Sequence, residues 1–249
     1  MKIQPGFINW GNLGVVLLAA LAVGVLYAAP SPGAGTKTYD LTTAEDSNKS
    51  GLNPAGPWWL LSGTTLVPYN KIPEPSGSCL SGYPGIKTDW SLGNVLGNCI
   101  PAFIVASGTG PGTPPDFLKG DVLVHSQDDG NGPGNGQASV TWTAPANGTI
   151  RVAGVIWYAQ SAQKRSNTFT LTLGKSTLAT GTVAFNSVIG HNRDNRLPFT
   201  SSGTLSVTAG DVVKLTIEKS PGQPYGSIDG LDLGVTETTV ASKTTPMVE

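Results

Sequence analysis

The chain has 249 residues, which is enough for one large β domain or two small ones. Charged residues make up only 12% of it and its formal net charge is −1, so its surface has no field that would concentrate nucleic acid or an anionic membrane. Glycine (33 residues) and proline (19 residues) are abundant, which is typical of short strands joined by tight turns and favours an all-β fold.

The first element is a continuous apolar run from Leu13 to Ala29. A terminal run of this kind is typical of an export segment, and the linker that follows it at 30–36 argues against a buried core helix. The run is longer than many signal-peptide cores and slightly short for a spanning helix, so a cleaved signal peptide and a retained anchor are both open. We expect residues 1–35 to be an export or anchor helix with a short linker. The protein would then be secreted or held at the cell surface, and would meet the membrane only through this segment if it is not cleaved.

The next region, from Asn53 to Pro115, is rich in Pro, Gly, Ser and Asn, and predicts strands joined by long loops. It contains the two cysteines of the chain, Cys79 and Cys99. An even pair of cysteines in an exported chain favours a disulfide, with two separate reduced thiols as the alternative. A zinc site is not indicated, because no Cys-x-x-Cys pair or histidine cluster accompanies them.

The carboxyl-terminal half shows the clearest strands, because β-branched and aromatic residues alternate between turn signals. The predicted strands are Gly120–His125, Ala138–Thr143, Thr149–Ala159, Thr168–Leu173, Thr177–Phe185, Gly203–Val207, Val212–Lys219 and Ile228–Val235. We expect one antiparallel β-sandwich domain over residues 36–235, with a loop-rich first half. Residues 236–249 are predicted to be a polar tail.

Several short motifs together resemble a group of exported bacterial proteins, many of which carry a PEP-CTERM sorting tail. The motifs are Tyr39–Leu41, Asn53–Trp58, Val122–His125, Thr141–Pro145, Gly148–Ile150 and Ala209–Val213. That group is similar to carbohydrate-binding modules, so the resemblance implies a jelly-roll sandwich.

This chain departs from the pattern of the group at its carboxyl end, where it lacks the hydrophobic helix and basic end of a sorting tail. The letters Pro-Glu-Pro do occur within Ile72–Pro75, but they lie in mid-chain and predict a loop, because proline cannot donate a hydrogen bond to a strand ladder. We therefore do not expect surface retention by that route.

Aromatic side chains are the first candidates for ligand contact, because sugar rings stack on flat apolar faces. Trp90 lies in loop-rich sequence. Within Thr149–Ala159, strand alternation places Trp157 on the face opposite Ile150 and Ile156, together with Arg151. We predict Trp90, Trp157 and Arg151 as ligand-binding residues; the alternative for each tryptophan is a place in the core.

The loop from Gly190 to Arg196 offers a second set of polar groups. His191, Arg193 and Asp194 could together hold sugar hydroxyls or a carboxylate, and a solvated loop is the alternative.

The glycine-rich segment 128–135 carries oxygen ligands of the kind that calcium prefers, on Asp128, Asp129, Asn131 and Asn135. It is not an EF-hand, because Val140 stands where the bidentate glutamate belongs. A structural calcium site and a simple Asx-rich turn are therefore both open, and no other cofactor is indicated.

Catalytic signatures are absent from the sequence. Its two histidines are His125 and His191, and neither a Gly-x-Ser-x-Gly nor a His-Glu-x-x-His motif occurs. The paired carboxylates of a glycosidase leave no spacing signature, so a glycan-active hydrolase stays as a third hypothesis. The first hypothesis is a non-catalytic module that binds an extracellular glycan or a surface protein, and the second is a structural or adhesive component of the cell surface.

Overall fold

The structure is a computed structural model, described here for residues 35–43, 53–71, 85–86, 88–91, 99–129, 136–185 and 191–239, all within one compact unit. Its strands are β1 (Gly35–Asp40), β2 (Trp58–Ser62), β3 (Thr65–Leu66), β4 (Tyr69–Lys71), β5 (Thr88–Trp90), β6 (Ala102–Val105), β7 (Val122–His125), β8 (Ala138–Thr143), β9 (Gly148–Tyr158), β10 (Ser166–Leu173), β11 (Ser176–Ala184), β12 (Leu197–Thr200), β13 (Leu205–Val207), β14 (Val212–Lys219) and β15 (Ile228–Thr239).

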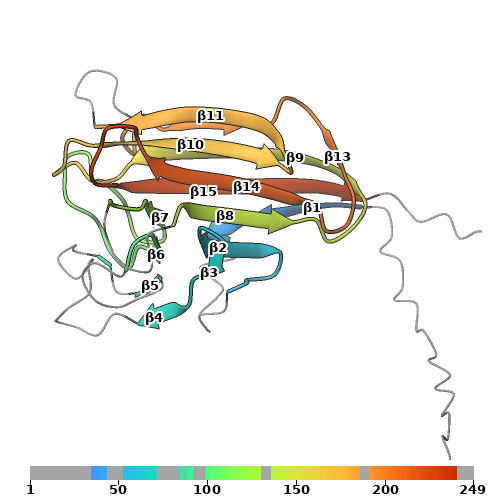
Figure 1. Cartoon of the computed structure of the whole chain (residues 1–249), viewed down its shortest axis with the longest axis horizontal. Helices are drawn as coiled ribbons and strands as arrows, with labels where there is room; N and C mark the ends of the chain where they lie inside the picture. The colour runs from blue at the N-terminus through green and yellow to red at the C-terminus, as the bar shows by residue number, and fades with distance from the viewer. Residues whose placement is uncertain are drawn as a thin grey trace, which may run out of the picture. The chain divides into compact units, whose positions relative to one another are not determined.

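The strands form two antiparallel sheets (Figure 1). The larger sheet has the order β12-β9-β15-β7-β6-β5-β4, with β1 added beside β15 and β13 beside β9. The smaller sheet has the order β11-β10-β14-β8-β2-β3. From β8 onward the chain passes back and forth between the sheets, so residues far apart in sequence become neighbours. The predicted all-β fold with antiparallel sheets is confirmed.

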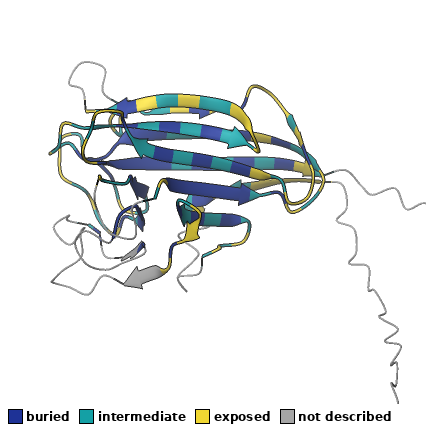
Figure 2. Ribbon diagram, in the orientation of Figure 1, coloured by how far each residue is buried: buried dark blue, intermediate teal, exposed yellow. Residues whose placement is uncertain are grey.

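The core lies between the two sheets, where alternate residues of each strand point inward. Ile150, Val152 and Ile156 of β9 belong to it, as the alternation predicted, and so does Trp142 of β8. Figure 2 shows that the central strands are largely buried. Along β10 and β14, buried residues alternate with less buried ones.

A second apolar cluster covers part of the outer face of the larger sheet. Its members include Ile104, Phe117, Leu123, Trp157 and Ile228. Phe117 comes from the connection 106–121 between β6 and β7, so this connection folds back over the sheet and shields it from water. The outer face is therefore divided into a covered apolar part and an exposed polar part, the latter including Arg151.

Strand boundaries follow the prediction closely in the second half, and β8 and β14 have the predicted ends. Two strands differ, because β12 (Leu197–Thr200) was not predicted and β15 continues past Val235 to Thr239. Residues 236–239 are thus part of the sheet and not of a polar tail. The strand β1, which pairs with them over Gly35 to Asp40, was not predicted.

The predicted export or anchor segment, Leu13–Ala29, lies outside the described residues. Among the residues that are described, the structure has no helix with the length and apolar character needed to span a membrane.

Candidate functional site

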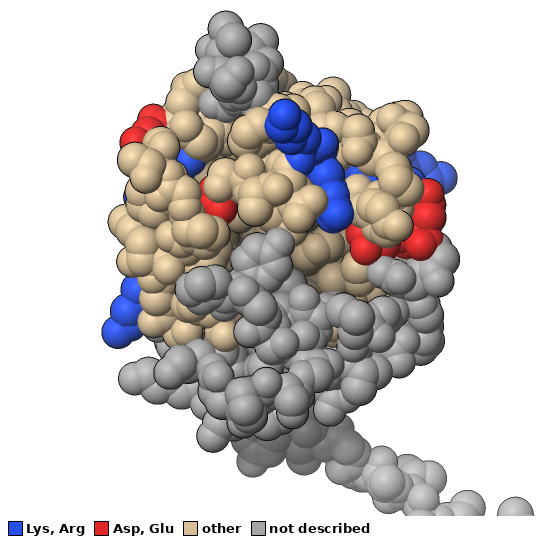
Figure 3. Space-filling model, turned by 90° about the vertical axis from the view of Figure 1, so that its left-hand side faces the viewer, with Lys and Arg blue, Asp and Glu red and all other residues tan. Residues whose placement is uncertain are grey.

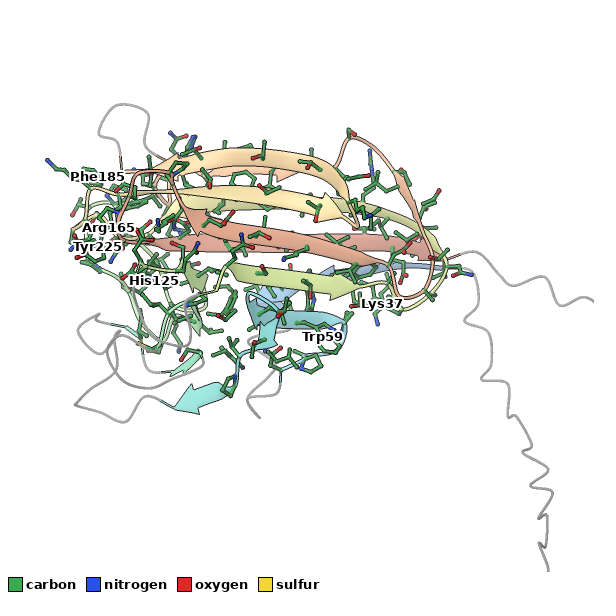
Figure 4. The ribbon with its side chains drawn as sticks, in the orientation of Figure 1. Lys37, Trp59, His125, Arg165, Phe185 and Tyr225 are labelled. Carbon is green, nitrogen blue, oxygen red and sulfur yellow. The ribbon has the colours of Figure 1, made fainter. Side chains whose placement is uncertain are left out.

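One end of the sandwich gathers exposed aromatic side chains beside a cation. Tyr225, in the connection between β14 and β15, is 51% exposed, and Phe185, directly after β11, is 37% exposed. The guanidinium carbon of Arg165 lies 5.0 Å from the ring centre of Tyr225, and its Nη1 donates to the carbonyl of Gly226 at 2.6 Å. Figure 4 shows Phe185, Arg165, Tyr225 and His125 at this same end, which we call the aromatic end.

The connections at the aromatic end are held by a buried hydrogen-bond network around Asn167 of β10. Its Nδ2 donates to Asp229 Oδ2 at 2.7 Å and to the carbonyl of Ser227 at 3.1 Å, and its Oδ1 accepts from Ser126 Oγ at 2.8 Å. Ser126 Oγ in turn accepts from the backbone N–H of Ser227 at 3.1 Å. All four residues are fully buried. The side chain of Asn167 thereby links the end of β7, the start of β10 and the start of β15. These links hold the connection that carries Tyr225 in a defined position.

Asp229 within this network lies in an environment that favours its neutral form. Burial raises the pKa of its carboxyl well above the ordinary value, and the hydrogen bond from Asn167 only partly opposes this. Its Oδ1 is buried and has no hydrogen-bond partner. The folded protein therefore keeps this proton to a higher pH than the unfolded chain does. The contribution of Asp229 to stability is fully present below the unfolded pKa and is lost as the pH rises through the folded pKa.

We expect the variant Asp229→Asn to reduce this pH dependence, because an amide resembles the neutral acid and does not titrate. Urea unfolding of both proteins from pH 4 to pH 9 measures the effect. The free energy of unfolding of the parent should fall relative to that of the variant as the pH rises. Two pH profiles that run parallel over the whole range would contradict this assignment of Asp229.

His125 is buried below the aromatic end, and its Nδ1 lies 2.7 Å from the carbonyl oxygen of Ser126. Burial lowers the pKa of its imidazole, the bond to Ser126 and the charge of Asp128 oppose that shift, and the charge of Arg165 adds to it. The ring contacts the carbonyl of Ser126, while the hydroxyl of Ser126 donates to Asn167. This geometry makes His125 part of the scaffold and does not place it as a base for Ser126.

The predicted calcium loop is described only at its start. Asp128 Oδ1 accepts from the N–H of Gly226 at 2.6 Å, and Asp129 Oδ1 lies 3.0 Å from Lys219 Nζ. Asn131 and Asn135 lie outside the described residues. In the described part of the chain no three His, Cys, Asp or Glu side chains gather in a way that could hold a metal ion. The calcium site thus stays a prediction.

Trp157 and Trp90 were predicted as ligand platforms, and this is wrong because both are buried, at 0% and 3% exposure. Trp157 does lie on the outer face of the larger sheet, but the connection 106–121 covers that face, and its Nε1 donates to the carbonyl of Asp116 at 2.9 Å. The guanidinium of Arg196 lies 4.6 Å from the ring centre. Trp90 packs into the core between the sheets. A buried ring face cannot stack on a sugar.

The polar loop after Gly190 packs beside Trp157. Arg193 forms a two-bond ion pair with Asp121, at 2.7 and 3.0 Å, and its guanidinium carbon lies 6.0 Å from the Trp157 ring centre. Asp194 is exposed, and His191 is half-buried with Nδ1 3.2 Å from the carbonyl oxygen of Asn195.

Arg151 lies elsewhere, near the start of β9, and is paired in register with Thr236. No described contact joins it to Trp157 or to the 191–194 loop, so the structure does not assemble the predicted ligand set into one site.

Cys99 is fully buried and takes part in a disulfide. Cys79 lies outside the described residues, so the pairing Cys79–Cys99 stays a prediction.

Sequence reasoning missed Tyr225, Phe185 and Arg165. A signal was present for Tyr225, since a single aromatic residue between Pro224 and Gly226 stands in a turn, where its ring has little chance of entering a strand face. Phe185 and Arg165 gave no such signal, because Phe185 ends the predicted strand Thr177–Phe185 and Arg165 is one of several polar residues in the loop before Thr168.

No protein-family model and no curated protein matches the chain. Solved structures resemble parts of it at low identity. The C-terminal CBM6 of LamC, from Zobellia galactanivorans, is 14% identical, covers 46% of this chain and 79% of its own, and has a TM-score of 0.25. The K3 cleaved adhesin domain of Lys-gingipain, from Porphyromonas gingivalis w83, is 17% identical, with 47% and 74% coverage and a TM-score of 0.28. Xyl-CBM35 in complex with a glucuronic-acid-containing disaccharide is 15% identical, with 41% and 70% coverage and a TM-score of 0.25. At these scores the likeness carries no conclusion about what this chain binds.

Proposed function

We propose that this chain is an exported, non-catalytic module of the jelly-roll type that binds an extracellular glycan at its aromatic end. The observation that carries the proposal is Tyr225, a half-exposed ring placed beside Arg165 and above a buried network. A ring has two faces, and Arg165 covers one of them. The other can stack on the apolar face of a sugar, while Arg165 supports the ring from the opposite face.

The charge of the aromatic end favours a neutral ligand. Figure 3 views the molecule from this end, and the described surface is mostly uncharged with scattered side chains of both signs. Asp129 is already paired with Lys219, and Asp128 with the backbone of Gly226. Such a surface has no dense positive patch to hold a polyanion, and it supports a neutral oligosaccharide better than an acidic one.

The binding test uses the full chain on an array of neutral plant and microbial oligosaccharides, followed by titration calorimetry with the best one. We expect Tyr225→Ala to weaken binding several-fold, because one aromatic stacking contact is worth about 1 kcal/mol. The melting temperature should change little, because the ring is half-exposed. Val212→Ala is the matched control, since Val212 is also an exposed apolar residue but begins β14, at the other end of that strand.

Equal affinity of the parent and Tyr225→Ala would overturn the placement of the site. Failure of the parent to bind any glycan would favour the alternative, a structural or adhesive component of the cell surface that meets a protein partner.

A further inference from the structure

A second, separate site lies at the opposite end of β15, where β1 joins the sheet. A pocket of about 330 Å³ opens there, and its lining includes Lys37, Tyr39, Pro145, Ala146 and Glu237. Glu237 and Lys37 face each other across the β1–β15 ladder. Figure 4 shows Lys37 far from Tyr225 and Arg165, so the pocket is distinct from the aromatic end.

Glu237 is the unusual member of this pocket, because its carboxylate is buried and only half satisfied. The residue is 2% exposed. Its Oε2 accepts from the hydroxyl of Tyr39 at 3.0 Å, and its Oε1 is buried without a hydrogen-bond partner. Burial and this bond to Glu237 raise the pKa of Tyr39 to about 12. The hydroxyl of Tyr39 therefore stays protonated and acts as the hydrogen-bond donor to Oε2. A buried carboxylate oxygen that lacks a partner is costly, and a donor that reaches it regains a large interaction.

Lys37 supplies the opposite charge but does not neutralise Glu237. No ion pair within the described residues joins the two, and the ammonium lies 4.6 Å from the ring centre of Tyr39. Lys37 is exposed, so its flexible stem can leave the ring. Both Lys37 and Glu237 line the pocket, so a ligand there lies between a flexible ammonium and the carboxylate.

We infer that the pocket binds a small zwitterion of the α-amino acid type. The ligand ammonium would donate to Oε1 of Glu237, and its carboxylate would accept from Nζ of Lys37. The charges of Lys37 and Glu237 sum to zero. This matches a ligand of zero net charge that carries separate positive and negative groups. A neutral sugar also has zero net charge, but its hydroxyl gives the buried carboxylate a weaker hydrogen bond than an ammonium does. The side chain of the ligand would pack on Pro145 and Ala146.

Titration calorimetry of the full chain with a panel of free L-amino acids and, separately, neutral monosaccharides tests this site. We expect an amino acid to bind, and Glu237→Gln to weaken it at least tenfold, because the amide loses the charge while keeping an oxygen for Tyr39. Lys37→Met should weaken it several-fold and cannot be dismissed as a folding defect, since Lys37 is exposed. Thr236→Val is the matched control, as Thr236 lies on the face of β15 opposite Glu237, contacts Thr38 and not a pocket residue, and should leave binding unchanged.

Tyr225→Ala separates this inference from the glycan proposal, because it should leave amino acid binding intact. The inference is overturned if no amino acid binds, if Glu237→Gln and Lys37→Met both bind as the parent does, or if only monosaccharides bind in a manner that depends on Glu237.

Discussion

Replacing Gly230 by alanine is expected to lower the free energy of unfolding by about 3 kcal/mol, the upper part of the range for an overpacked core. A β-carbon at Gly230 would overlap the indole ring of Trp157, which lies across it from the neighbouring strand β9. The ring cannot move aside, because Asp116 accepts its N–H and Arg196 lies against it. The backbone cannot shift either, since β15 is hydrogen-bonded to β9 and to β7 at this level.

Gly234→Ala is the matched control for this prediction, because it lies in the same strand but its added β-carbon would meet only two backbone oxygens, at 3.7 and 3.8 Å. Urea unfolding should show a large fall in midpoint for Gly230→Ala and a small change for Gly234→Ala. In a Trp157→Ala background the additional effect of Gly230→Ala should nearly vanish, because the overlapping ring is gone. Equal losses in the two glycine variants would refute the explanation.

Asn167→Leu is expected to destabilise the protein by about 4 kcal/mol, although leucine has the same number and branching of side-chain heavy atoms as asparagine. The substitution leaves Ser126, Asp229 and the carbonyl of Ser227 without the amide that now pairs with them. Each buried polar group that loses its partner costs about 1–3 kcal/mol, and part of that is recovered as these groups rearrange.

Thr168→Val serves as the comparison for Asn167→Leu, because Thr168 is the next residue of β10 and points to the other side of the sheet. Its replacement should change the free energy of unfolding by less than about 1 kcal/mol. Hydrogen exchange gives a second measurement: the amides at 126–128 and 225–229 should lose protection in Asn167→Leu before the centre of β10 does. A variant as stable as the parent would mean that the network contributes nothing to the fold.

The sequence predicted most strands of the second half, because their apolar and polar residues alternate and several of them end near a Pro or Gly turn, but it missed β12. Ala138–Thr143 and Val212–Lys219 have the observed ends for this reason. The prediction failed at the last strand, because residues 236–239 are polar on both faces of the strand. One of these polar residues, Glu237, is buried and hydrogen-bonded to Tyr39 of β1. A partner nearly two hundred residues away leaves no local pattern.

The candidate site was predicted less well, and Trp157 shows why. Alternation placed its side chain on the correct face of β9, but the exposure of that face depends on the connection 106–121, which packs on it through Phe117. Proline-rich and glycine-rich sequence predicts a loop and says nothing about which surface the loop covers. Tyr225 is the opposite case, because its exposure follows from its place in a turn. The sequence shows that turn, but the prediction did not use it.

The pairing of β1 with β15 also decides how the domain would respond to a mechanical load. Gly35 lies opposite Thr239, so the two ends of the described fold leave the sheet side by side (Figure 1). A force that draws these ends apart would act on one hydrogen-bonded pair at a time, starting at Gly35 and peeling β1 away, which resists tension far less than shearing a whole ladder at once. The pocket around Glu237 spans this same seam, so a molecule bound there would fasten the first and last strands together, and stretching the domain would release it.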